Sequence, residues 1–234
     1  MTFKLSIKPI LLIASVIINV VLIGYVINSL NSEPIPVVNQ SNIKDDNYFS
    51  EHFKVDDRVL FVGNSLIYRC DWKELLDNQN IENKGVGGIT TYEIFMRYNN
   101  IIKGKPKKIF FLMGINDLLK DAPENLIMEN YHRILYQLKA SSPLTEVYFL
   151  SLLPVNPELR SDDTPEFTTN ETVDHLNLTI KNFTDTFGLH YVDVNSILKN
   201  EEGSIDSTYS EDGVHITQLA YEKMKTILKE KVEE

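Results

Sequence analysis

Residues 59–70 read VLFVGNSLIYRC, and this stretch decides the fold. Its first four residues form an unbroken apolar run, which is typical of a parallel strand that is covered on both faces. The run stops at Gly63-Asn64-Ser65, and a new apolar pattern follows with no ordinary turn between them. Ligands of open α/β sheets bind at the carboxyl ends of the strands, so this junction is well placed to present a functional side chain.

From Arg58 onward, short apolar runs alternate with segments of helical periodicity. The predicted strands are residues 58–62, about 81–86, 108–113, 146–152 and 189–193. The predicted helices have apolar faces formed by Ile127, Tyr131, Ile134 and Leu138, by Val173, Leu176, Ile180, Phe183 and Phe187, and by Leu219, Ala220, Met224, Ile227 and Leu228. This alternation predicts a three-layer α/β/α sandwich around a mostly parallel five-stranded sheet with right-handed crossovers.

The composition of the 234-residue chain narrows the classes of partner and cofactor. The formal net charge is −10 and no Lys/Arg-rich stripe stands out, which argues against nucleic acid as the main partner. Cys70 is the only cysteine, so the chain can form neither an intrachain disulfide nor a cysteine-based metal cluster, and we expect this thiol to be a small core residue. No H-x-H or H-E-x-x-H pattern occurs, so we expect neither a metal nor another cofactor.

A long uncharged run precedes the predicted domain. The 24 residues between Lys8 and Glu33 carry no charge, and as a helix they would span roughly 36 Å, enough to cross a hydrocarbon core of about 30 Å. A cleaved signal peptide would have a shorter apolar core and a small-residue cleavage site, and the exit of this run offers no convincing one. The run therefore favours an uncleaved anchor, with a secreted protein as the alternative.

The charges that flank this run predict its orientation. Lys4 and Lys8 precede it, whereas Glu33, Asp45 and Asp46 follow it, so the positive-inside rule leaves the short N-terminal tail in the cytoplasm. The predicted organisation is a cytoplasmic tail (1–8), a transmembrane signal anchor (9–30), a polar linker with two prolines (31–55) and an extracytoplasmic domain (56–234). We therefore expect the protein to cross a cell membrane once.

Four short stretches carry the functional prediction. They are Gly63-Asn64-Ser65-Leu66, Gly85-Val86-Gly87-Gly88, Gly114-Ile115-Asn116-Asp117 and Asp212-Gly213-Val214-His215. In this order and spacing they resemble the SGNH (GDSL-type) hydrolases, a family of serine esterases and acylhydrolases. The resemblance covers about residues 57–232 and implies a flavodoxin-like SGNH hydrolase fold. One departure is that the usual G-D-S of the family is G-N-S here, which leaves Ser65 in place.

The resemblance implies a role for each residue, and elementary chemistry supports it. A serine hydroxyl such as that of Ser65 needs an adjacent base, here His215, to remove its proton. Asp212 lies three residues before that histidine and can orient the imidazole. The backbone N–H groups of Ser65 and Gly88 and the side-chain amide of Asn116 are implied as donors to the oxyanion.

Other interpretations fit the sequence less well or stay open. The Gly85–Gly88 stretch is not a G-x-G-x-x-G pattern and follows the second strand, so it does not indicate a dinucleotide site. A membrane-tethered binding module with an inactive hydrolase fold is an interpretation from a different class of function. It is disfavoured because the predicted catalytic residues are all present: Ser65, Asn116, Asp212 and His215.

The predicted substrate is a small acyl ester, and the O-acetyl groups of cell-envelope glycans are the leading choice. The polar loop 155–169 does not look like an apolar lipid lid, which favours a short acyl group. A lysophospholipase or thioesterase acting on lipids, and acyl transfer to a sugar instead of water, are the alternatives. Asp117 is expected to support its loop rather than to take part in the chemistry.

Overall fold

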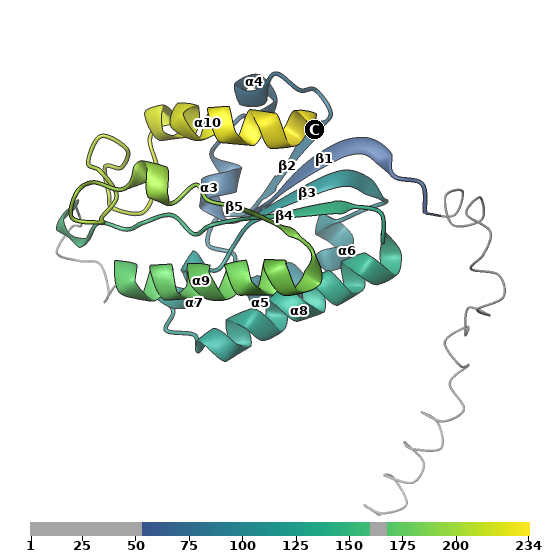
Figure 1. Ribbon diagram of the computed structural model, residues 1–234, viewed down its shortest axis with the longest axis horizontal. Helices are drawn as coiled ribbons and strands as arrows, with labels where there is room; N and C mark the ends of the chain where they lie inside the picture. The colour runs from purple at the N-terminus through teal and green to yellow at the C-terminus, as the bar shows by residue number, and fades with distance from the viewer. Residues whose placement is uncertain (1–52, 160–167) are drawn as a thin grey trace, which may run out of the picture. The chain divides into compact units, whose positions relative to one another are not determined.

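The computed structural model describes residues 53–159 and 168–234, which form an α/β unit (Figure 1). The predicted tail, the predicted anchor and most of the predicted linker lie outside these residues. The strands are β1 (Asp56–Gly63), β2 (Ile81–Gly85), β3 (Pro106–Leu112), β4 (Glu146–Leu150) and β5 (His190–Val192). They pair in the order β2-β1-β3-β4-β5, and every pair is parallel, which confirms the predicted sheet.

Helices cover both faces of this sheet (Figure 1). One face packs against α3 (Ser65–Tyr68), α4 (Trp72–Leu76) and α10 (Gln218–Glu233). The other packs against α5 (Thr91–Met96), α6 (Tyr98–Ile101), α7 (Ile115–Leu119), α8 (Glu124–Ser141) and α9 (Asn170–Phe187). Two short 3-10 helices, η2 (Pro157–Leu159) and η3 (Ser196–Leu198), follow β4 and β5. The three predicted layers are therefore confirmed.

Alternating side chains of the central strands supply the two halves of the core. In β1, Val59 and Phe61 belong to the cluster under α4 and α10, whereas Leu60 and Val62 belong to the cluster under α8 and α9. Aromatic rings also stack across neighbouring strands: the Phe61 and Phe110 centroids are 4.8 Å apart. The apolar run of β1 is therefore continuous because the strand is buried on both faces, which confirms the prediction.

The last helix corrects one detail of the prediction. Leu219 was expected on the apolar face of α10 but is 54% exposed, whereas the neighbouring Tyr221 is buried. The Tyr221 ring packs edge-on against Trp72, and its hydroxyl donates a hydrogen bond to the Leu66 carbonyl. Tyrosine can therefore be buried here although it carries a polar group. Cys70 is buried as predicted, and burial raises the pKa of its thiol to about 12.

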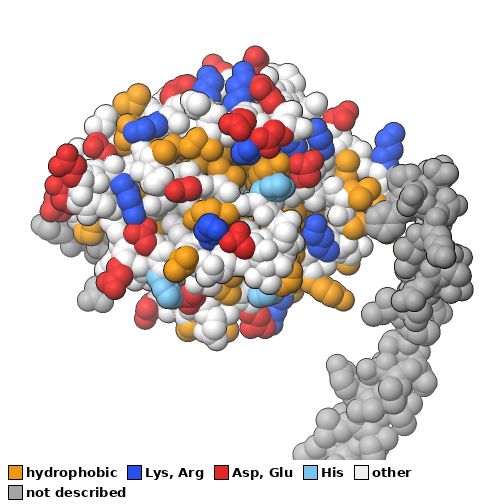
Figure 2. All heavy atoms as spheres, in the orientation of Figure 1, with side chains coloured by type: hydrophobic (Ala, Val, Ile, Leu, Met, Phe, Trp, Pro, Cys, Tyr) orange, Lys and Arg blue, Asp and Glu red, His pale blue; other side chains and the backbone are white. Residues whose placement is uncertain are grey.

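Two further observations bear on partners. Acidic and basic side chains are interspersed on the face of the molecule that Figure 2 shows, without a continuous basic patch there. Among the helices of residues 53–159 and 168–234, none combines the length and apolar character that a membrane crossing requires. The predicted anchor, residues 9–30, lies outside the described residues.

Candidate active site

Three side chains from two distant parts of the sequence meet at the carboxyl end of β1. Ser65 is the first residue of α3, and its Oγ lies 3.0 Å from Nε2 of His215, which is 150 residues later in the chain. The other ring nitrogen of His215, Nδ1, lies 2.6 Å from Oδ2 of Asp212. Hydroxyl, imidazole and carboxylate are therefore linked in series by hydrogen bonds, an arrangement that can pass the hydroxyl proton to the ring.

The short helix that carries Ser65 is held by side chains from three other elements. A helix of four residues can satisfy few of its own carbonyl groups, so most of them need partners from outside the helix. The Leu66 carbonyl accepts a hydrogen bond from the Tyr221 hydroxyl at 2.7 Å, and the Ile67 carbonyl accepts bonds from Trp72 Nε1 at 2.9 Å and Asn83 Nδ2 at 2.8 Å. These bonds fix the position of α3, and with it the position of the hydroxyl.

Asn64 is the N-cap residue of α3, and only its side-chain oxygen has a clear role. Its Oδ1 accepts a hydrogen bond from the Leu66 N–H at 2.9 Å, which is the usual role of an N-cap residue. Its Nδ2 is buried and has no hydrogen-bond partner within the described part of the chain. The capping bond needs only an oxygen, so nothing in the structure accounts for Asn64 where the family pattern has aspartate.

The loop before α10 is shaped to bring His215 to the serine. Gly213 adopts a φ of +80°, and a Cβ at this position would lie 2.1 Å from the carbonyl oxygen of Asn156. The Asn156 N–H donates a hydrogen bond to the Gly213 carbonyl at 2.9 Å. The Ser210 hydroxyl spans the loop, since it accepts from the Gly213 N–H and donates to the His215 carbonyl. Only glycine satisfies both the dihedral angle and the close approach.

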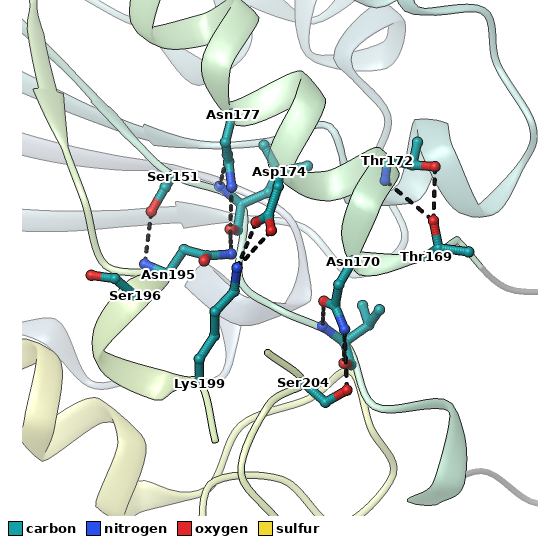
Figure 3. A network of polar contacts seen from close by, with 12 residues as sticks. Ser151, Thr169, Asn170, Thr172, Asp174, Asn177, Asn195, Ser196, Lys199 and Ser204 are labelled. Atoms are coloured by element: carbon teal, nitrogen blue, oxygen red, sulfur yellow. Dashed lines mark hydrogen bonds and ion pairs between the residues drawn. The ribbon is translucent and has the colours of Figure 1, made fainter. Parts of the chain in front are cut away.

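Amide side chains anchor the segment after β4 that carries Asn156 (Figure 3). Asn177 of α9 accepts from the Leu152 N–H at 2.7 Å and donates to the Leu152 carbonyl at 2.9 Å, as a neighbouring strand would. Asn170, at the start of the same helix, pairs in the same way with the backbone of Val155. The loop that positions His215 is therefore braced, through Asn156, by α9.

The predicted oxyanion donors lie on the loops after β2 and β3. Gly88 adopts a φ of +71°, and a Cβ there would meet nothing within 4 Å, so the space on the side-chain side of this residue is open. Asn116, the second residue of α7, donates one N–H of its amide to the Ile89 carbonyl at 2.9 Å. This bond ties Asn116 to the residue after Gly88 and leaves the second N–H of the amide for another acceptor.

Asp117 links the same two loops through hydrogen bonds. Its carboxylate accepts hydrogen bonds from the Thr91 backbone N–H at 2.9 Å and the Thr91 hydroxyl at 2.6 Å. That hydroxyl in turn accepts from Asn130 Nδ2 at 3.0 Å. Burial raises the pKa of the Asp117 carboxyl, although the bonds from Thr91 act in the opposite direction. These contacts agree with the supporting role predicted for Asp117.

The electrostatics of the Asp212 carboxyl favour its charged form. Partial burial raises its pKa, but hydrogen bonds from the His215 ring and from the backbone N–H groups of His215 and Val214 outweigh that effect, so the pKa lies below its ordinary value. The carboxylate is therefore available to stabilise a positive imidazole. Within residues 53–159 and 168–234, no three His, Cys, Asp or Glu side chains are arranged to hold a metal ion.

The comparison with known families decides where this site belongs. The GDSL-like Lipase/Acylhydrolase family matches residues 61–223, more than half of the chain, including all the stretches on which the resemblance rested. The chain belongs to this family. Membership supports ester hydrolysis in general terms, without a particular acyl group or alcohol.

Solved structures similar to this GDSL-like acylhydrolase agree with its fold. One from Streptococcus pneumonia, described as a platelet activating factor, is 26% identical with a TM-score of 0.72, covering 79% of this chain and 88% of that one. A GDSL-like lipase from Bacteroides thetaiotaomicron VPI-5482 is 21% identical with a TM-score of 0.64, covering 76% and 88%. This second likeness bears on the fold alone.

A curated relative of this GDSL-like acylhydrolase is a longer protein. The N-acylneuraminate cytidylyltransferase of Escherichia coli O18:K1:H7 is 22% identical over 179 residues, which are 75% of this chain but 39% of the relative. The chain thus spans about two fifths of that protein.

The sequence motifs predict the reacting groups but not the residues that position them. Thr91, Asn130, Asn156 and Ser210 carry no pattern of their own, and they become visible only through contacts between distant segments. Residues 160–167 of the polar loop that favoured a short acyl group lie outside the described residues.

Proposed function

We propose that this protein is a serine esterase that acts on small carboxylic esters. The observation that carries the proposal is the 3.0 Å approach of Ser65 Oγ to His215 Nε2, with Asp212 on the opposite ring nitrogen. His215 takes the hydroxyl proton while Oγ bonds to the ester carbonyl carbon, which becomes tetrahedral and carries a negative oxygen. The N–H groups of Ser65 and Gly88 and the free amide N–H of Asn116 stabilise that oxygen.

Collapse of this intermediate breaks the bond to the alcohol. The leaving oxygen takes the proton from His215, and an acyl group stays bonded to Ser65. Water then loses a proton to His215 and attacks the acyl carbon, which forms a second tetrahedral intermediate. Its collapse breaks the bond to Ser65 Oγ, which takes the proton back from His215, and the carboxylic acid is released. Acyl transfer to a sugar would follow the same path with a sugar hydroxyl in place of water.

A short acyl group, such as the O-acetyl group of a carbohydrate, is the substrate that we favour. The described cavity that includes His215 among its lining residues has a volume of about 250 Å³ and is lined mainly by polar side chains. This polar lining suits a carbohydrate as the alcohol half of the ester. The polar loop 155–169 is the feature that favours a short acyl group. The uncharged run at residues 9–30 supports a membrane-anchored enzyme that works outside the cytoplasm on envelope glycans.

The experiment that tests this proposal compares p-nitrophenyl acetate, octanoate and palmitate as substrates of the wild type, Ser65→Ala and Ser207→Ala. Ser207 is an exposed serine far from Ser65 in the sequence, so its variant controls for the replacement of a serine hydroxyl. We expect the wild type and Ser207→Ala to prefer the acetyl ester and Ser65→Ala to lose turnover. Turnover by Ser65→Ala would contradict the assigned nucleophile, and a preference for palmitate would favour the lipid-directed alternative.

The proposed location has its own test. The full chain should remain in the membrane pellet after extraction at alkaline pH, because an uncleaved apolar helix is not released by the loss of surface charge contacts. Recovery of a shortened chain in the medium would favour the secreted alternative.

A further inference from the structure

An unpaired arginine lies one helical turn beyond the proposed nucleophile. Arg69 directly follows α3, and its N–H donates a hydrogen bond to the Ser65 carbonyl at 3.0 Å. Its side chain is exposed and takes part in no ion pair or hydrogen bond with the described residues. Arg58, by contrast, is bonded to both Asp56 and Glu82. The guanidinium of Arg69 is therefore free to bind something else.

The position of Arg69 identifies which half of an ester it can reach. Arg69, Asp212 and His215 line the same 250 Å³ cavity, together with the start of α10. The predicted oxyanion residues Gly88 and Asn116 do not line this cavity. In the proposed reaction His215 must donate a proton to the leaving alcohol, so the alcohol lies on the His215 side of the reacting carbon. The cavity borders His215 but not Ser65, so it is placed to hold a part of the alcohol that lies beyond the scissile oxygen, not the acyl group.

The charges around the cavity indicate what that alcohol carries. The carboxylate of Asp212 is already bound to the His215 ring and backbone, which offsets its attraction for the arginine. Glu211 lines the same cavity, but its carboxylate forms no ion pair with the guanidinium. Arg69 is the only lysine or arginine among the described residues that line this cavity. A planar guanidinium binds carboxylate and phosphate groups through paired hydrogen bonds.

We propose that Arg69 determines specificity by binding a negatively charged group on the alcohol half of the ester. This inference rests on the proposed function and narrows its substrate class to esters of acidic alcohols, such as an O-acetylated sugar acid. Glu211 opposes this preference through repulsion and limits how tightly the anion is held.

The test uses acetyl esters that differ in the charge of the alcohol. The substrates are 4-acetoxybenzoate, its neutral methyl ester and 4-acetoxyphenyl phosphate, and the readout is the ratio of kcat/KM for each anionic ester to that for the neutral ester. We expect Arg69→Gln to lower this ratio about two- to fivefold, the effect of losing one exposed charge pair, and Glu211→Gln to raise it. The larger of the two anionic ratios distinguishes carboxylate from phosphate recognition.

Two controls make the result specific. Arg97, an exposed arginine at the end of α5 on the opposite face of the sheet, has no ion pair among the described residues, and Arg97→Gln should leave the ratio unchanged. A carboxylate on the acyl half, as in p-nitrophenyl hemisuccinate, should be insensitive to Arg69→Gln. An active wild-type enzyme whose ratio does not change in Arg69→Gln, or changes equally in Arg97→Gln, would overturn the inference and leave the proposed esterase intact. Absence of turnover of every ester by the wild type would overturn both.

Discussion

Asp212 holds His215 at two points at once. One carboxylate oxygen lies 2.6 Å from ring Nδ1, and the other accepts the backbone N–H of His215 at 2.7 Å. The two residues are three apart on one loop, so a single turn fixes both the position of the histidine backbone and the direction of its ring. A ring held in this way keeps Nε2 directed at Ser65.

Replacing the carboxylate should remove the orientation and the charge together. We expect Asp212→Asn to lower kcat by about 10²- to 10⁴-fold, because an amide can hold the wrong tautomer and cannot stabilise a positive imidazole. The measurement is kcat on a neutral acetyl ester. Asp77→Asn is the matched control, since Asp77 is an exposed aspartate in a left-handed conformation that asparagine tolerates. Equal activity of the two variants would remove Asp212 from the mechanism.

The side-chain amide of Asn116 is predicted to act on the transition state more than on substrate binding. Asn116→Ala should lower kcat by about 10²- to 10³-fold with a smaller change in KM, since one oxyanion donor is lost. The exposed Asn125 of α8 provides the control variant Asn125→Ala. A change confined to KM would show that the amide binds substrate without stabilising the oxyanion.

Two glycines with nearly the same dihedral angle separate backbone strain from steric clash. A Cβ on Gly203 (φ +81°) would lie in open space, whereas a Cβ on Gly213 (φ +80°) would lie 2.1 Å from the Asn156 carbonyl. Gly203→Ala should lower the free energy of unfolding by about 1–2 kcal/mol, the cost of the left-handed conformation. Gly213→Ala should cost more and should also lower kcat, because the loop that carries His215 must move. Urea denaturation and kcat measure the two effects, and equal losses in both variants would contradict the account.

Part of the fold and of the candidate site could be predicted from local patterns in the sequence. The stretches after β1 and β3 are local patterns, because an apolar run is followed by a glycine and then by a polar residue. The resemblance to a known family then predicted roles for Ser65, Gly88 and Asn116. The resemblance predicted His215 as the base, and Asp212 three residues earlier supported that prediction. The parallel sheet followed from the same alternation of strands and helices.

The rest of the site depends on long-range contacts that leave no local pattern. Asn177 supports the segment after β4 through the backbone of Leu152, 25 residues away, and its side chain gives no periodic signal. Lys108 is similar: a lysine in a strand is ordinarily exposed, yet this one is fully buried and donates to the Lys231 carbonyl near the end of α10. Such residues satisfy backbone groups that the sequence does not show to be unpaired.

Asp117 provides a prediction for the dependence of stability on pH. Its pKa is raised in the folded state, so between the ordinary Asp value of about 3.9 and the raised value the folded chain holds a proton that the unfolded chain has lost. The contribution of this group to the free energy of unfolding therefore falls as the pH rises through that window. Asp212 has the opposite sign: its pKa is lowered, so its stabilising contribution is lost as the pH falls.

The measurement is urea denaturation of the wild type and Asp117→Asn across this pH range. The variant lacks the titrating group, so its stability relative to the wild type should improve as the pH rises, even if the loss of an acceptor for Thr91 destabilises it at every pH. A difference between the two proteins that stays constant with pH would show that Asp117 does not titrate in this window.

The central claim is that His215 activates the Ser65 hydroxyl, and covalent labelling tests it most directly. A fluorophosphonate reacts with an activated serine, and peptide mass spectrometry identifies the residue that it modifies. We predict labelling of the wild type at Ser65 alone, loss of labelling in Ser65→Ala and strongly slowed labelling in His215→Ala. An active wild type that is labelled at another residue, or is not labelled at all, would contradict the account.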